Sequence, residues 1–285
     1  MRVRTSEYKP MDFSTKAKPS GLAIAMAVAA LVWTNAANAQ VEAGASAVAQ
    51  GEARTLDDHS HDDHLNLGLG AIRAPAYQGS DTYRTRAFPA VDASWGPLFA
   101  NSRDGIGVRA IDTGLLTVGA GLTWMQGYKA KYVPDGIGKL KSGAAARGYI
   151  SVRTDGFVAT VGAKKGLSGD NKGAAIDASL AYPIQLSSRT TIIPTVGTTW
   201  TNRKYNNRYF GVDADQSLAS GLPRFKAGDG FTNIAAALTV NHQLTDRISL
   251  GASIGVNRTL GEVKDSPLVS DKTQALGLAF FAYHF

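Results

Sequence analysis

The feature that most constrains the fold of this chain is a repeated alternation of apolar residues with small or polar ones from residue 64 onward. The segment "RISLGASIGVN" puts apolar side chains at every second position: Ile248, Leu250, Ala252, Ile254 and Val256. A period of two gives a β-strand two different faces. With about nine to eleven residues, a tilted strand of this kind is long enough to cross a bilayer.

Twelve such segments are predicted, at residues 64–74, 84–95, 97–103, 105–111, 115–126, 146–154, 157–165, 173–183, 190–201, 231–243, 247–257 and 273–285. Short links between them, such as "DTG", "TDG", "IQLSS" and "TDR", alternate with long ones. Short periplasmic turns and longer extracellular loops are typical of bacterial outer-membrane barrels. The predicted fold class is therefore all-β: a transmembrane antiparallel β-barrel of about 12 strands over residues 64–285.

The charged residues of these strands fall on the face opposite the apolar row. A soluble β-sandwich would place its charges outward, whereas a Lys or Arg facing lipid near the bilayer midplane costs about 2–4 kcal/mol. We therefore expect eight charged side chains to line the lumen: Arg86, Asp92, Arg109, Arg147, Arg153, Lys164, Asp177 and Arg247. Their basic excess has two interpretations, a closed interior filled by ion pairs or a narrow pore for small anions.

The front of the chain is predicted to direct export. Residues 1–39 combine a basic start, the 13-residue apolar core "GLAIAMAVAALVW" and "ANA" before Gln40, so we expect a signal peptide cleaved after Ala39. The core is shorter than the roughly 20 residues of a transmembrane helix. Residues 40–63 are small, polar and acidic, which predicts a disordered periplasmic linker. The predicted location is the cell outer membrane.

The sequence offers few candidates for chemistry. It has no cysteine, which excludes disulfides and thiolate sites. The run "HSHDDH" holds His59, His61 and His64; we interpret it as a solvated acidic linker, with a surface metal site as the alternative. Only His242 lies well inside a predicted strand, and no serine adjoins it. We therefore expect neither a cofactor nor an enzyme.

The longest predicted loop, residues 202–230, is rich in Arg and aromatic residues, which are favoured at binding hot spots. Its candidate contact residues are Arg203, Tyr209, Phe210, Arg224 and Phe225. The same loop could instead fold across the mouth of the barrel as a partial plug, and the sequence does not choose between the two.

The final segment, "LGLAFFAYHF", is predicted to be the last strand and its assembly signal. Phe281, Tyr283 and Phe285 alternate on one side of it. We expect this row to be recognised by the barrel assembly machinery and to face lipid when the last strand pairs with the first.

Four segments resemble the MltA-interacting protein family, also called the MipA/OmpV family: "PAYQGSDTYRTRAFPAVDASWG", "LFANSRDGIGV", "YFGVDADQSLASGLPRFKAGDGF" and "GEVKDSPLVSDKTQ". The resemblance covers residues 64–285. It implies a non-enzymatic outer-membrane barrel acting as a scaffold between a murein lytic transglycosylase and a murein synthase. Because the periplasmic turns are short, residues 40–63 would supply most of the periplasmic surface for such a role.

Two other functions are kept as alternatives to the scaffold. One is a narrow channel for small, anionic solutes, and the other is an adhesin that acts through the extracellular loops. Outer-membrane lipid and lipopolysaccharide are the expected surroundings. The formal net charge of +7 falls to about +4 without residues 1–39, and this mild charge is spread along the chain, so we expect no nucleic-acid partner.

Overall fold

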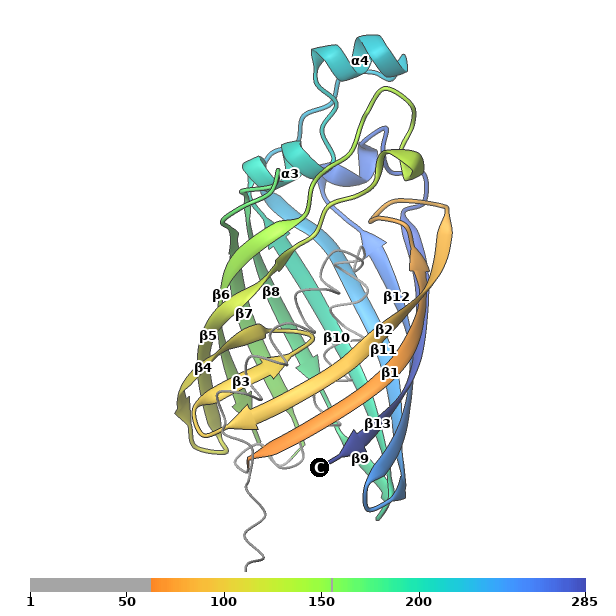
Figure 1. Cartoon of the computed structure of the whole chain (residues 1–285). Helices are drawn as coiled ribbons and strands as arrows, with labels where there is room; N and C mark the ends of the chain where they lie inside the picture. Colours follow the sequence, from red (N-terminus) through yellow and green to blue (C-terminus); the bar gives the residue numbers. More distant parts are fainter. Residues whose placement is uncertain (1–62, 155) are drawn as a thin grey trace, which may run out of the picture.

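The computed structural model describes residues 63–154 and 156–285, which form a β-barrel (Figure 1). The predicted signal peptide and all but the last residue of the predicted linker lie outside the described residues. The strands are β1 (His64–Pro75), β2 (Tyr83–Trp95), β3 (Leu98–Asn101), β4 (Gly105–Asp112), β5 (Leu116–Met125), β6 (Gly143–Arg153), β7 (Val158–Gly166), β8 (Ala174–Ala181), β9 (Ile184–Ser187), β10 (Thr190–Thr201), β11 (Gly230–Thr245), β12 (Ile248–Thr259) and β13 (Thr273–His284).

All strand pairs are antiparallel, and twelve of the strands form a closed ring. The ring closes where β1 meets β13, with Asn66 opposite His284 at one end of the seam and Arg73 opposite Gly277 at the other. Pairing of β1 with β13 closes the edge that the first and last strands would otherwise leave free. The predicted fold class, including the strand number, is confirmed. No helix among the described residues is both long and apolar enough to cross a membrane.

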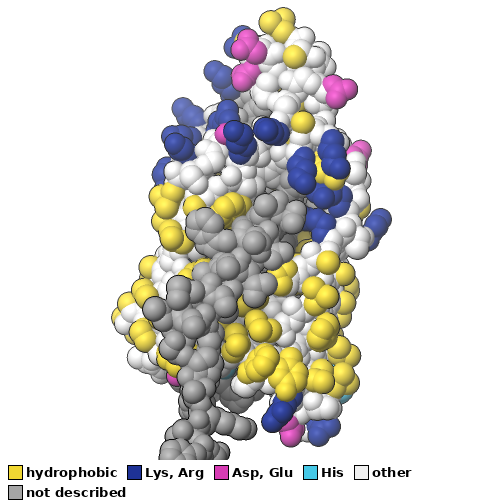
Figure 2. Space-filling model, in the orientation of Figure 1, with side chains coloured by type: hydrophobic (Ala, Val, Ile, Leu, Met, Phe, Trp, Pro, Cys, Tyr) yellow, Lys and Arg dark blue, Asp and Glu magenta, His cyan; other side chains and the backbone are white. Residues whose placement is uncertain are grey.

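The alternation predicted from the sequence sets the two faces of the wall. On β12, Leu250 and Ile254 are 44% and 67% exposed, whereas Ser249 and Ser253 between them are each 2% exposed. The apolar row therefore faces outward and the polar row faces the lumen. On the face seen in Figure 2, hydrophobic side chains cover much of the wall, and Lys and Arg side chains gather toward the end that carries the helices.

Two details of the wall differ from the prediction. The segment "IQLSS", expected to be a simple link, forms β9, which pairs with Thr190–Ile192 of β10. Pro183 separates β9 from β8, because proline lacks the N–H that a continuous ladder requires. Secondly, β3 is short and pairs with β2 only over Asp92–Trp95, so the tip of the β3–β4 hairpin lies partway up the wall (Figure 1).

Four loops pack together at the end of the barrel opposite the C-terminus (Figure 1). They comprise residues 76–82, 126–142, 202–229 and 260–272, and we call them the outer cap. They contain η1 (Ala130–Tyr132), α3 (Arg203–Tyr209), α4 (Ala214–Ser220) and η2 (Glu262–Asp265). A capping box of Asp213 and Gln216 starts α4, and Gly221, at φ 73°, ends it. The largest hydrophobic cluster of the described residues lies in this cap.

Candidate functional site in the lumen

The guanidinium of Arg147 on β6 is the centre of a buried group of charged residues in the lumen. Its Nε donates to Asp104 Oδ1 at 2.7 Å. Its two terminal nitrogens donate to the carboxylate of Asp177 on β8, at 2.6 and 3.1 Å. Gly162 of β7 makes this possible, because a Cβ at that position would lie 2.5 Å from Arg147 Nη2. The arginine therefore lies flat across β7 and joins the two strands that flank it.

The short β3–β4 hairpin completes this group. Its tip carries Asp104 and also Arg103, whose Nη2 lies 3.7 Å from Asp177 Oδ2. Lys164 of β7 is half-buried on the inward row of the same wall. Together these residues place three cations and two carboxylates at one level of the lumen; we call them the lumen network: Arg103, Asp104, Arg147, Lys164 and Asp177. The network therefore joins the tip of the β3–β4 hairpin to β6 and β8 on the inward side of the wall.

The other predicted lumen charges lie on the inward rows of their strands. Arg109 Nη1 donates to Ser94 Oγ at 2.6 Å, and its guanidinium lies 5.5 Å from the ring centre of Phe99. Asp92 is 2% exposed. Arg86 and Arg153 are half-buried.

Arg247 is the exception, and the prediction that it faces the lumen is wrong. It is exposed in the turn between β11 and β12, with Nη1 3.4 Å from the Tyr283 hydroxyl. The reason is that β12 starts only at Ile248. Arg247 therefore belongs to the turn, where the alternation of the strand does not determine which way its side chain points.

The histidine run predicted as an alternative metal site is only partly within the described residues. His59 and His61 lie outside them. His64 begins β1, and its Nε2 lies 3.2 Å from Asp92 Oδ2. Among the described residues, no group of three or more His, Cys, Asp or Glu is arranged to hold a metal ion.

Two of the three aromatic residues predicted as loop contacts are buried in the outer cap. Tyr209 and Phe210 are 1% and 0% exposed, and Phe225 packs against the same cluster. The ring of Tyr209 contacts that of Tyr128 at 5.5 Å between centroids. For Tyr209 and Phe210 the prediction of a contact surface is therefore wrong, because burial removes these two rings from any partner. Phe225 is half-buried and lines a pocket of the cap. Only Arg203 and Arg224 of that set are exposed.

Two tyrosines of the cap are held in the neutral form. Burial raises the pKa of Tyr77 to about 12, and the nearby Asp81 adds to the effect. Burial likewise raises the pKa of Tyr128 to about 12, with a further contribution from Tyr77. The Tyr77 hydroxyl donates to the carbonyl of Leu268 at 2.9 Å, which ties the first loop of the cap to the last.

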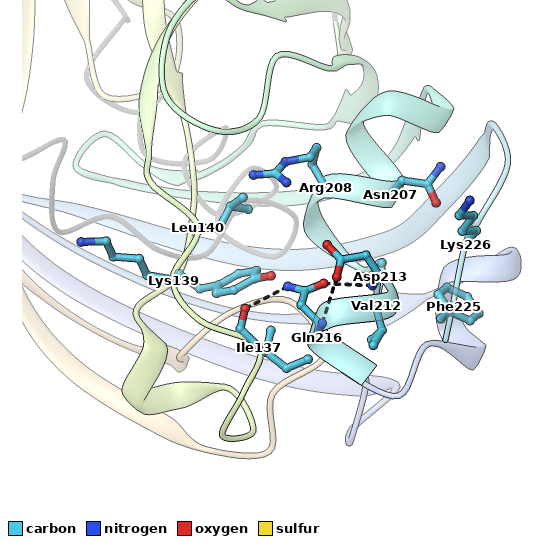
Figure 3. A pocket seen from close by; sticks show the side chains of 12 residues that line it. Ile137, Lys139, Leu140, Asn207, Arg208, Val212, Asp213, Gln216, Phe225 and Lys226 are labelled. Atoms are coloured by element: carbon cyan, nitrogen blue, oxygen red, sulfur yellow. Dashed lines mark hydrogen bonds between the residues drawn. The ribbon is translucent and has the colours of Figure 1, made fainter. Parts of the chain in front are cut away.

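A pocket opens in the outer cap between residues 126–142 and 202–229 (Figure 3). Tyr128, Leu140 and Phe225 give it apolar walls, and three cations line it: Lys139, Arg208 and Lys226. The one carboxylate in the lining, that of Asp213, accepts from the backbone N of Gln216 at 2.9 Å. The pocket is therefore a basic recess on the extracellular side.

Comparison with known proteins identifies the family. The family model described as MltA-interacting protein MipA matches residues 67–285. The chain belongs to this family. Its relatives include the outer membrane protein Omp26La of Vibrio anguillarum, 28% identical over 116 residues, which are 41% of this chain and 44% of that protein. The putative outer membrane protein YiaT of Escherichia coli K12 is 24% identical over 179 residues, 62% of this chain and 61% of that protein. The matches thus span less than two thirds of either relative.

Solved barrels of low sequence identity also resemble this member of the MipA family. The NanC porin has a TM-score of 0.42 and 12% identity, with 77% of this chain and 98% of that chain covered. An outer membrane channel from Pseudomonas putida F1 has a TM-score of 0.41 and 12% identity, with 79% and 96% covered. The closed barrel and the outer-membrane relatives place this MipA-family protein in the outer membrane, as predicted.

Proposed function

We propose that this MipA-family protein acts as a closed interaction barrel that contacts murein-synthesising and lytic enzymes from the periplasmic side. The observation that supports it best is the lumen network: Arg147 is bound by both Asp104 and Asp177, so the most extensively paired cation of the lumen serves to join parts of the wall. The hydrophobic cluster of the outer cap likewise packs the loops together at the extracellular end. The family description names MltA, a murein lytic transglycosylase, as the partner.

The proposed periplasmic contact surface is the rim formed by β9 and the end of β11. Three large apolar side chains there are exposed: Ile184 by 38%, Leu186 by 59% and Leu244 by 44%. This rim adds area to turns that are otherwise short. The predicted linker, residues 40–63, would contribute further surface to the same partner.

A pull-down with the full-length protein in detergent and a purified murein lytic transglycosylase tests this role. We expect the wild type to capture the enzyme and Leu186→Asp to lose it. The matched control is Leu218→Asp, because Leu218 is 87% exposed on α4 at the opposite end of the barrel. Equal capture by both variants would contradict the β9 rim as the contact surface, and no capture by the wild type would contradict the role itself.

A second candidate, a narrow channel for small anions, is favoured by the basic excess of the lumen. Arg86, Arg103, Arg109, Arg147 and Lys164 outnumber the carboxylates Asp92, Asp104 and Asp177 on the inward side. A ring of cations selects anions when water fills a pore. Conduction would require the outer cap to move away from the mouth.

Single-channel recording in planar bilayers separates the two functions. Anion-selective steps whose selectivity falls in Lys164→Gln, but not in the exposed loop variant Lys272→Gln, would support the channel. A silent bilayer containing correctly folded protein would support the interaction barrel. An adhesin role has less support, since Tyr209 and Phe210 are buried and α4 is the part of the loop that projects (Figure 1).

A further inference from the structure

Three polar side chains form a hydrogen-bonded chain on the lumen wall that neither proposed function uses. Ser249 Oγ lies 2.9 Å from His284 Nε2, and His284 Nδ1 lies 2.8 Å from Asn66 Oδ1. The tautomer follows from these partners: Nδ1–H donates to the amide oxygen, which leaves Nε2 to accept the serine proton. A nucleophile, a base and a group that orients the base in this order are the geometric signature of an activated serine.

The seam of the barrel creates this arrangement. Asn66 and His284 are direct partners across β1 and β13, and Ser249 lies on β12, the next strand. Ser249 and Asn66 are 2% and 4% exposed, and His284 is half-buried. The three residues lie near the periplasmic end, where β1 begins and β13 ends (Figure 1).

The inward row of β13 next to this chain is apolar, whereas the inward neighbours on β12 and β2 are the polar Ser253 and Asp92. Following β13 toward the cap, its inward row continues from His284 to Ala282, Phe280 and Leu278, all buried. The Phe280 ring packs over Gly251, where a Cβ would lie 2.2 Å from it. Ile72 and Phe88 extend this cluster onto β1 and β2. An apolar strip beside an activated serine suits the hydrocarbon chain of an ester.

A hydrogen-bond donor is available for the negative charge that develops during ester cleavage. Gln243 is the direct cross-strand partner of Ser249 on β11. It follows Thr239 and Asn241 at every second position of β11, and it is exposed at the periplasmic end of that strand. Its side-chain amide can donate to a carbonyl oxygen held at Ser249, which is the role of an oxyanion-hole donor.

We propose that Ser249, His284 and Asn66 form the catalytic group of an esterase that cleaves fatty acyl esters entering from the periplasmic mouth. Ser249 Oγ attacks the ester carbonyl and forms an Oγ–C bond, while His284 Nε2 takes the hydroxyl proton. The bond from the carbonyl carbon to the alcohol oxygen then breaks, and His284 returns the proton to the departing alcohol. Water, deprotonated by His284, releases the acyl chain as a carboxylic acid and restores the serine. Asn66 acts as a positioning residue.

Labelling with a fluorescent alkyl fluorophosphonate tests the nucleophile in the full-length, detergent-folded protein. We expect labelling of the wild type, with the adduct mapped to Ser249 by peptide mass spectrometry, and none of heat-unfolded protein. Ser249→Ala should lose the label. Ser253→Ala is the matched control, because Ser253 lies on the same inward row of β12, is equally buried and bonds Thr239 at 2.8 Å. An unlabelled wild type, or equal labelling of Ser249→Ala, would overturn the proposal.

Hydrolysis of 4-nitrophenyl octanoate and acetate tests the chemistry. Ser249→Ala should lower kcat about 10³-fold or more for the octanoate ester. Gln243→Ala should lower kcat about 10²-fold with little change in KM, as expected for a donor that acts in the transition state. His242→Ala should leave the rate unchanged, since His242 is exposed and bonds Thr190. Equal kcat/KM for the two esters would contradict the apolar strip as the acyl site.

Discussion

Arg147 on β6 and Asp177 on β8 meet across the glycine that β7 contributes between them, with Nη1 of the arginine 2.6 Å from Oδ1 of the aspartate. Two non-adjacent strands of the wall are therefore joined from inside the lumen. Asp104 approaches the same arginine from the tip of the short hairpin. These ion pairs inside the lumen therefore stabilise the wall of the barrel.

Breaking this pair should destabilise the barrel strongly. Asp177→Asn leaves the buried Arg147 with one carboxylate partner fewer, and removing one member of a buried pair costs about 3–5 kcal/mol. The measurement is urea unfolding in detergent micelles. Asp265→Asn is the control, because Asp265 and Lys272 form a pair whose side chains are 59% and 53% exposed and should contribute under about 1 kcal/mol. Similar midpoints for the two variants would contradict a structural role for the lumen network.

The outer cap should be weakened by Phe210→Ala while the wall remains folded. Phe210 is fully buried, and truncation of a buried Phe costs about 3–5 kcal/mol. We expect faster proteolytic cleavage within residues 202–229. The heat-dependent change in electrophoretic mobility, which reports a folded barrel, should stay the same. Leu218→Ala should leave the cleavage rate unchanged, since Leu218 is 87% exposed. Loss of the gel shift in Phe210→Ala would show that cap and wall fold as one unit.

The cap should also lose stability in alkaline solution. The pKa of both Tyr77 and Tyr128 is about 12 when folded and 10.0 in the unfolded reference. Their contribution is therefore complete below pH 10 and is lost as the pH rises toward 12, by up to about 1.4 kcal/mol per pH unit for each group. Tyrosinate absorbance should show a late ionisation step that shrinks in Tyr128→Phe and persists in the control Tyr182→Phe. Complete ionisation near pH 10 would contradict the buried packing.

Phe285 should matter more for assembly than for export. Its backbone N donates to the carbonyl of Leu65 at 3.1 Å, and its ring lies 4.8 Å from that of Tyr283, so it ties β13 to β1 at the seam. We expect Phe285→Ala to reach the periplasm normally but to give less heat-modifiable barrel in outer-membrane fractions. Phe231→Ala serves as the control, being another exposed phenylalanine, at the start of β11. Full assembly of Phe285→Ala would contradict a role for this residue in the seam.

The sequence predicted the wall well because a strand's two faces are set by local alternation. Eleven-residue patterns such as "RISLGASIGVN" fix which side chains of β12 face outward, whatever the rest of the chain does. The same rule placed Arg147 and Asp177 inside. It failed for Arg247, which lies in a turn, and for "IQLSS", where pairing resumes after Pro183.

The outer cap was the least predictable part, because loops carry no period that reports burial. Tyr209 and Phe210 looked like exposed contact residues in the sequence, yet they pack with Tyr128 and Leu268 from other loops. Nothing in residues 202–230 alone indicates which partners bury these rings. Only the arrangement of four loops around one mouth brings them together.

The sequence by itself determined that this protein is an antiparallel barrel with an apolar outer face and a charged lumen, because alternation is a local property of each strand. Only the tertiary structure decided which inward residues meet. Ser249, His284 and Asn66 are spread over nearly the whole barrel domain, and Arg147 meets Asp104 and Asp177 from strands and loops on either side of it. Those contacts depend on strand register and on how the last strand pairs with the first. The alternation within a single strand determines neither of these.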